Sequence, residues 1–440
     1  MKKLLMILVS VTLLLPLYAQ EAESEFNLGT AEQTESDEGN VQIWNEDELI
    51  AEEEEPQPEQ PKKPFTYARE KVEFGIDVGA GFDNDFIGMA DFFQENIVID
   101  LNKVDDLLGD DGLNLNLDID GGLFFNVMNI AISGGIWEFG FFSGADGNIH
   151  GNIPQSLFTL ISEGNKEHNS FSGMISASGG IYANVGLRAS AKYEKLRVGI
   201  RPTLYTPLVF IPKSGITYHL DTEEDISLRT TGEINIYNPI DEDGQFGLQF
   251  GFDMSLEGEY ELFPFLDVGG TFSRIPIAPA KVENLMKLTM SNLDFDISGE
   301  DLLNGEGMNL PDFDKLDFTS TPETAPYNVL RPLRFDVYAR YKPFYTEFLV
   351  VKPNIGFSVD INEKEGYFNA GLEGQLNLKD LFLLHLGTGY EEAAWKHRLG
   401  FILNLRAFEL GLEAALRSSD FVGSFGAKGL AFNLGMRFGW

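Results

Sequence analysis

The chain has 440 residues, no cysteine and a formal net charge of −37. The absence of thiols excludes disulfide bridges, cysteine-ligated zinc, thiol catalysis and a lipid-modified cysteine. The acidic total argues against nucleic acid as a partner, because phosphate binding needs clustered lysine and arginine. It suits an extracellular surface, or a pore that favours neutral or cationic solutes.

The first 19 residues are typical of a secretory signal peptide. A short basic region at Lys2 and Lys3 precedes an apolar run from Leu4 to Leu17, and a plausible cleavage site follows at Ala19. The alternative is an uncleaved anchor helix, but the run is shorter than the roughly 20 residues that a spanning helix needs. We therefore predict export and cleavage.

Residues 20–64 predict a disordered, acidic periplasmic tail. Positions 21–60 hold fifteen Asp or Glu residues and no Lys or Arg. A segment rich in Glu, Gln and Pro buries too little apolar surface to offset the entropy of ordering. An apolar island between Val41 and Ile50 is compatible with a short helix that docks on a periplasmic partner, although an unstructured tail is the simpler interpretation.

From Lys71 onward, apolar side chains alternate with polar or small ones at the period of a β-strand. The clearest runs are residues 72–82, 113–120, 181–192, 246–257, 333–341, 368–378, 382–390, 399–405 and 430–440. Short turns alternate with longer polar inserts, such as residues 143–169 and 238–244. We therefore predict an all-β fold for residues 65–440, an antiparallel transmembrane β-barrel of about 14 strands.

Two long inserts interrupt the strand pattern. Residues 87–108 space their apolar side chains more like a helix than a strand. In residues 275–331, Pro276 and Pro279 precede a segment, 281–288, that predicts a short amphipathic helix. Long inserts in a barrel either fold outward or fill the interior as a plug, and the apolar content of these two favours a plug or lid.

The carboxyl-terminal strand is the most regular of the series. Its apolar face consists of Leu430, Phe432, Leu434, Met436, Phe438 and Trp440. In a membrane barrel such a face contacts lipid, whereas in a soluble β-sandwich it would pack in a core. Together with the signal peptide it favours the bacterial outer membrane. We expect outer-membrane lipid around the barrel, and expect the barrel-assembly machinery to bind this strand.

The polar strand faces would line the lumen of such a barrel. The candidate lumen-facing residues are Asp77, Arg188, Arg201, Asp253, Arg334, Asp336 and Arg340. Opposite charges on these faces would meet across the interior as ion pairs. They would either brace the wall or set a field that sorts solutes.

The sequence offers no marked catalytic or metal site. Its five histidines show no metal-ligand spacing, and it has no Gly-x-Ser-x-Gly elbow. The Asp-rich segments 83–85 and 105–111 offer oxygen ligands, but neither matches an EF-hand loop, so solvated acidic loops are the simpler interpretation. We predict no enzymatic activity, no cofactor and no metal.

The alternating strands, the stretch FLDVGGTFSRIPIAPA at residues 265–280 and the Phe-Gly-Trp end at residues 438–440 carry a family resemblance. The chain resembles uncharacterised spirochaete-type outer-membrane barrels related to the long-chain fatty-acid transporter. The resemblance implies a 14-stranded barrel, an amino-terminal hatch in the lumen and lateral passage of hydrophobic substrates. A clear Asn-Pro-Ala hatch motif near the mature start is missing, and no binding residue is carried over.

The expected function is therefore passive uptake of small, hydrophobic molecules through a partly plugged lumen. The alternative is a structural or surface-interaction barrel whose long loops bind host or partner proteins, with no role in transport.

Overall fold

The computed structural model describes residues 71–84, 112–163, 170–221, 225–240, 247, 249–289, 295–298, 319–392, 394–405, 407–419, 421–425 and 428–440. The chain divides into two compact units, residues 1–62 and 63–440, and all described residues belong to the second. The predicted signal peptide, the acidic tail and the insert at residues 87–108 lie outside the described part. Among the described helices, none combines the length and the apolar character needed to cross a membrane.

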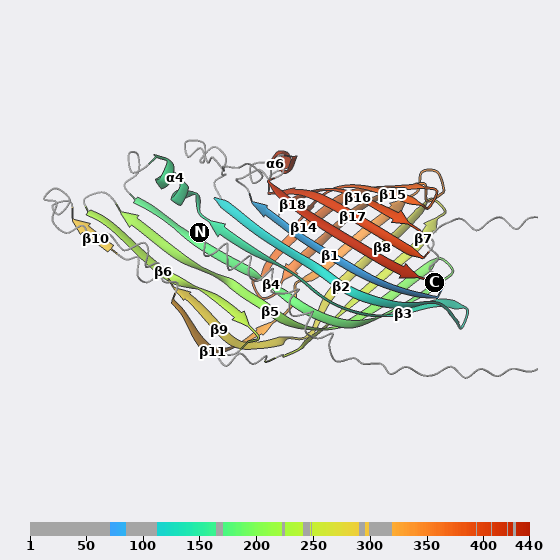
Figure 1. Cartoon of the computed structure of the whole chain (residues 1–440), viewed down its shortest axis with the longest axis horizontal. Helices are drawn as coiled ribbons and strands as arrows, with labels where there is room; N and C mark the ends of the chain where they lie inside the picture. Colours follow the sequence, from blue (N-terminus) through green and yellow to red (C-terminus); the bar gives the residue numbers. More distant parts are fainter. Residues whose placement is uncertain are drawn as a thin grey trace, which may run out of the picture. The chain divides into compact units, whose positions relative to one another are not determined.

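The described residues form strands with two short helices (Figure 1). The elements are β1 (Val72–Asn84), β2 (Leu113–Ile132), β3 (Gly135–Ile153), α4 (Gln155–Glu163), β4 (Ser170–Tyr193), β5 (Leu196–Asp221), β6 (Asp225–Asn238), β7 (Gly251–Phe263), β8 (Leu266–Ala278), β9 (Ala280–Thr289), β10 (Phe295–Ser298), β11 (Thr319–Val329), β12 (Leu333–Tyr341), β13 (Leu349–Asp360), β14 (Glu365–Leu378), β15 (Phe382–Glu391), β16 (Ala394–Asn404), β17 (Phe408–Ser418), α6 (Phe421–Phe425) and β18 (Gly429–Gly439).

Fourteen of these strands close into one antiparallel ring. The ring runs from β1 through β5 in chain order, then through β7, β8 and β12, and then from β13 to β18. It closes because β18 pairs with β1, from Phe438 opposite Phe74 to Leu430 opposite Phe82. The prediction of an all-β, antiparallel barrel of about 14 strands is confirmed.

The other four strands, β6, β9, β10 and β11, extend the wall on one side. The 26-residue strand β5 pairs with β7 through its first half and with β6 through its second half. Strand β9 continues β8 after Pro279, pairs with β6 and β11, and β11 leads into β12. Strand β10 pairs with the start of β6.

The extension corrects the interpretation of residues 275–331. The predicted helix at 281–288 is strand β9, and the insert forms wall strands instead of a plug helix in its described part. The spacing of Val282, Leu285, Met286 and Leu288 fits a helix locally, but pairing with β6 and β11 on both sides favours the strand.

Two strand boundaries also differ from prediction. Residues 143–153, expected in a polar loop, complete β3, because their small and polar side chains pair with β2 and β4. Strand β7 begins at Gly251 instead of residue 246. In both cases the pairing partner, which is distant in sequence, decides where the strand ends.

The connections are tight at the rim that carries the chain ends of the barrel. Ser133 and Gly134, both with positive φ (50° and 81°), join β2 to β3, the geometry of a two-residue hairpin turn. Glu194, also with positive φ (48°), lies in the short turn between β4 and β5. At the same rim, Trp440 exchanges backbone hydrogen bonds with Val72 at 3.2 Å.

The two faces of the ring differ in polarity as the alternation predicts. Large apolar side chains such as Phe74, Leu187, Leu399 and Phe432 are exposed, with Leu187 60% accessible. Their neighbours along each strand are small or charged and point to the inner face, where ion pairs join strands that are not neighbours in the ring. An apolar belt outside a polar interior is the pattern of an outer-membrane barrel.

Candidate functional site

The interior of the ring is crossed by charged side chains in two places. We call the first group the Asp146 cluster. Its centre is Asp146 on β3, which pairs with Arg274 on β8 and lies 3.4 Å from Arg331 in the β11–β12 junction. Strands β4, β5 and β7 separate β3 from β8 along the wall, so the contact passes through the interior.

The Asp146 cluster is buried on one side and incompletely hydrogen-bonded. Asp253 on β7 is 2% exposed, and its carboxylate lies 3.5 Å from the guanidinium of Arg331, which is 7% exposed. Both carboxylate oxygens of Asp253, together with Nε and Nη1 of Arg331, lack a hydrogen-bond partner by geometry. Buried polar groups without hydrogen-bond partners lower the stability of the folded protein.

A local distortion of β8 aims Arg274 into the interior. Arg274 has a left-handed backbone (φ 59°), and its N–H donates to the hydroxyl of Ser255 at 3.1 Å. The ladder between β7 and β8 is irregular at this point. A bulge that redirects one side chain is a common device beside functional sites.

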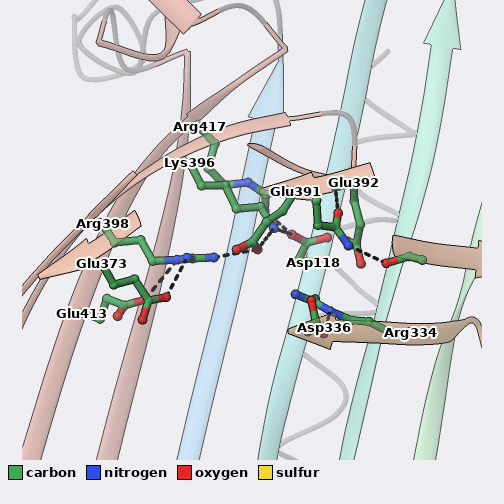
Figure 2. A network of polar contacts seen from close by, with 12 residues as sticks. Asp118, Arg334, Asp336, Glu373, Glu391, Glu392, Lys396, Arg398, Glu413 and Arg417 are labelled. Atoms are coloured by element: carbon green, nitrogen blue, oxygen red, sulfur yellow. Dashed lines mark hydrogen bonds and ion pairs between the residues drawn. The ribbon is translucent and has the colours of Figure 1, made fainter. Parts of the chain in front are cut away.

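The second charged group, most of which is drawn in Figure 2, comes from β14 to β17 and contacts β1 and β2. Arg417 on β17 pairs with Asp118 on β2 and lies 2.9 Å from Asp83 on β1. Lys396 lies 3.5 Å from Glu391. We call this group the Arg417 cluster.

Arg398 continues the Arg417 cluster along the wall. Its guanidinium lies 2.7 Å from Glu391, 3.7 Å from Glu373 and 3.8 Å from Glu413. In Figure 2 the Arg334–Asp336 pair of β12 lies beside these groups. Alternating charges of this kind neutralise one another and brace the inner wall.

Aromatic side chains fill the interior where the wall is extended. The buried cluster consists of Tyr182, Tyr205, Phe210, Tyr237, Ala280, Val282, Leu285 and Val329, with Ala325 and Tyr327 packed against it. The rings of Phe210 and Tyr237 both lie 5.3 Å from that of Tyr327. We call this group the aromatic cluster. It joins β4, β5, β6, β9 and β11 into one packed apolar unit.

The Asp146 cluster and the aromatic cluster meet at the β11–β12 junction. The hydroxyl of Tyr205 donates to the carbonyl of Val329 at 3.0 Å. The Asn362 amide donates to the carbonyl of Leu330 at 2.6 Å and accepts from its N–H at 2.9 Å. The next residue, Arg331, belongs to the Asp146 cluster. The three successive residues Val329, Leu330 and Arg331 therefore attach the extended wall to separate parts of the ring.

The wall has a break beside the aromatic cluster. Tyr205 lies opposite Gly251 of β7 and Phe210 lies opposite Tyr237 of β6, and the four residues of β5 between them have no register partner in β6 or β7 among the described residues. A cavity of about 160 Å³ lies here. Its lining is mostly polar and includes Thr206, Asn238, Gln249 and Asn284.

The seven candidate lumen-facing residues have separate sets of contacts. Asp253 belongs to the Asp146 cluster, and Arg334 pairs with Asp336 at 2.7 Å. The remaining four are placed separately: Arg188 lies 2.9 Å from Glu257, Arg201 stacks 3.8 Å over the ring of Phe142, Arg340 lies 3.3 Å from Asp267, and Asp77 lies beside Gly435 of β18. The structure therefore does not unite the seven in one site.

The sequence pattern does not mark the residues at the centres of the two clusters. Asp146, Arg274 and Arg331 fall in or beside segments predicted as loops, where no strand face could be assigned. Arg417 follows a regular strand pattern, and the alternation from Glu409 to Arg417 in β17 is a signal that would have placed it on the inner face. Its partners, in contrast, are distant in sequence.

The carboxyl-terminal strand pairs on both sides. Of its predicted apolar face, Phe432, Leu434 and Phe438 are exposed, and the residues of this face from Leu430 to Phe438 lie opposite apolar residues of β1 and β17. Within the described residues, no group of three or more His, Cys, Asp or Glu side chains is arranged to hold a metal ion.

Residues 67–255 match the model of a family of unknown function, DUF5723. No curated protein matches the chain.

Solved structures of FadL-family outer-membrane barrels match the chain. The toluene transporter TbuX of Ralstonia pickettii is 8% identical, covers 84% of this chain and 90% of its own, and has a TM-score of 0.43. The P. putida toluene transporter TodX is 10% identical, with coverages of 85% and 91% and a TM-score of 0.42. A Pseudomonas aeruginosa FadL homologue is 9% identical, with coverages of 84% and 90% and a TM-score of 0.41.

Proposed function

We propose that this protein is an outer-membrane barrel for the passive uptake of small hydrophobic molecules through a partly plugged interior. The aromatic cluster carries the proposal. It brings Tyr182 and Phe210 of the ring strands β4 and β5 together with Tyr237 and Tyr327 of the extended wall, whereas a water-filled porin presents polar side chains to its interior. A small apolar solute that entered between these packed side chains would exchange water for aromatic contacts.

The charged clusters support the selective part of the proposal. The Asp146 cluster lies next to the aromatic cluster and joins walls that are distant in the ring. Fixed ion pairs across the interior narrow the path available to hydrated solutes, while the aromatic side chains provide apolar contacts. The expected behaviour is therefore slow or absent passage of sugars and faster passage of apolar compounds.

A vesicle assay tests the proposal. Purified protein is reconstituted in vesicles with a lipopolysaccharide outer leaflet, and uptake of the apolar fluorophore N-phenylnaphthylamine is followed beside arabinose-induced swelling. Protein-dependent fluorophore uptake without swelling is the expected result. Rapid swelling would indicate a general pore and contradict the proposal.

A matched pair of variants links that assay to the aromatic cluster. Tyr327→Ala removes a ring that contacts Phe210 and Tyr237 and is expected to change fluorophore uptake. Tyr341→Ala removes an exposed ring from the outer face of β12 and is expected to leave uptake unchanged. Equal effects of the two variants on fluorophore uptake would contradict a role of the aromatic cluster in transport.

The second candidate is a structural or surface-interaction barrel. The Arg417 cluster favours it, because ion pairs that tie β17 to β1 and β2 brace a wall without providing a path. A barrel that takes up neither arabinose nor the fluorophore, yet binds cells or matrix proteins through its loops, would establish this alternative.

A further inference from the structure

The short helix α6 packs on the outer face of the wall, at the rim opposite the carboxyl terminus (Figure 1). The strand beneath it is β16, whose Lys396 lies 3.9 Å from Asp118 of β2. Because β17, β18 and β1 separate these two strands along the wall, that contact passes through the interior. Lys396 therefore faces inward, and its neighbours Trp395 and His397 face outward, toward α6.

Aromatic contacts hold α6 against these two outward side chains. The ring centres of Phe421 and Trp395 lie 4.8 Å apart, edge to face, and the ring of Phe425 stacks on His397 at 4.1 Å. Nδ1 of His397 is in turn hydrogen-bonded to the hydroxyl of Thr388 on β15 at 2.9 Å. The helix is thus seated on a fixed imidazole and an indole of the barrel wall.

The other side of α6 is apolar and uncovered. Phe421, Val422 and Phe425 are 44%, 74% and 60% exposed, whereas Ser424 is fully buried and its hydroxyl donates to the carbonyl of Phe421 at 2.6 Å. The helix therefore turns its polar side chain toward the protein and its large apolar side chains away from it, the reverse of a helix that packs on a protein surface in water.

The uncovered face of α6 continues the apolar belt of the ring. His397 lies level with Leu416 and Leu430, and the next outward row down the wall contains Leu399 and Phe432. These two side chains are 55% and 60% exposed. The apolar surface thus passes from the belt directly onto the helix at the rim.

We propose that α6 is an interfacial membrane anchor whose partner is the lipid of the outer leaflet. Phe421, Val422 and Phe425 enter the acyl region just below the headgroups, where aromatic and apolar side chains are favourable. The long inserts of a membrane barrel lie outside the cell, so this rim meets the outer leaflet. The anchor holds the connection between β17 and β18 beside the seam. The inference goes beyond uptake, because it holds whatever passes through the barrel.

The absence of native cysteine makes the test direct. Single nitroxide labels are placed at Val422→Cys in α6, at Leu187→Cys on the belt, and at Lys364→Cys in the β13–β14 turn, in protein reconstituted in lipid vesicles. Lys364 is the control at the same rim, beside Glu365, which forms an ion pair with Lys213 of β5. Power saturation then measures collisions of each label with oxygen, which concentrates in lipid, and with nickel-EDDA, which stays in water.

The Val422 label is expected to behave like the Leu187 label, with frequent oxygen collisions and severalfold fewer nickel collisions than the Lys364 label. Nickel collisions as frequent as at Lys364 would overturn the proposal. Shielding of the Val422 label from both reagents would also overturn it, because a second copy of the chain or another protein would then cover α6. The readout does not depend on uptake of any solute, so it stands apart from the transport assay.

Two variants of the Val422-labelled protein test the aromatic docking. Phe425→Ser removes the ring that stacks on His397, and we expect a severalfold rise in nickel collisions at position 422. Phe344→Ser removes a ring that is 59% exposed in the β12–β13 turn, at the other rim, and should leave these collisions unchanged. Unchanged collisions in Phe425→Ser would overturn the proposal. Heat-dependent gel migration confirms that each variant is folded.

Discussion

Arg417 on β17 and Asp83 on β1 lie 2.9 Å apart, although β18 runs between their strands. The side chains are 4% and 2% exposed. The pair therefore joins the first strand of the ring to the penultimate one across the seam where the ring closes. Backbone pairing of β18 with β1 closes the ring, and this ion pair ties the closure from the inside.

Replacing Arg417 tests the seam. Arg417→Met removes the cation that faces a buried carboxylate, and loss of one partner of a buried pair costs about 3–5 kcal/mol. Urea unfolding in lipid vesicles should show this loss. The double variant Arg417→Met with Asp83→Asn should recover part of it, because no buried charge then lacks its counter-ion. Equal stability of the double and single variants would contradict this account.

Replacing Asp146 tests the larger cross-ring cluster. Asp146→Ala leaves Arg274 and Arg331 facing each other in the interior, and we expect a loss of about 3–5 kcal/mol together with a higher single-channel conductance. Glu257→Ala is the control, because its partner Arg188 and Glu257 itself are both 39% exposed and such pairs contribute about 0–1 kcal/mol. If both variants unfold alike, the Asp146 cluster is not a structural centre.

A glycine in β4 tests the packing between strands. Gly179 has a φ of +119°, and an added Cβ would clash with the carbonyl oxygen of Asn148. Gly179→Ala should destabilise the barrel by about 1–3 kcal/mol through backbone strain, measured by urea unfolding. Gly374→Ala is the matched control, since the nearest atom there is 3.9 Å away, and it should be close to neutral.

Stability itself should depend on pH through Glu363. Burial, followed by the charges of Asp360 and Glu365, raises the pKa of its carboxyl from 4.5, the value in the unfolded chain, to about 7 in the folded protein. Its ionisation therefore opposes folding increasingly between these values and fully above them. Unfolding midpoints of the parent should fall from pH 5 to pH 8, and those of Glu363→Gln should fall less. Parallel pH profiles of the two proteins would contradict the assignment.

The carboxyl-terminal strand provides a test of assembly. We propose that the barrel-assembly machinery binds β18, whose edge also pairs with β1 and β17. Removing residues 438–440 should reduce insertion into the outer membrane of living cells more than folding into detergent in vitro. Heat-dependent gel migration gives the yield of folded protein in cells and in detergent, and the ratio of these two yields measures the effect. An equal reduction of both yields would contradict a role of the barrel-assembly machinery.

The alternation of apolar and polar residues was sufficient to predict the barrel. Period-two patterns such as Phe74 to Phe82 and Leu430 to Phe438 are local, and each strand's pattern assigns its own outward and inward face. The same rule assigns Arg188, Arg334 and Arg340 to the inward face.

Tertiary structure decided what the pattern left open. Residues 281–288 fit a helix by their own spacing, and only the edges offered by β6 and β11 make them strand β9. The partners of Arg417, Asp146 and Lys213 likewise come from strands far away in sequence. Sequence periodicity records which way a side chain points from its own backbone, whereas the group it meets across a closed ring depends on the register of every strand between them.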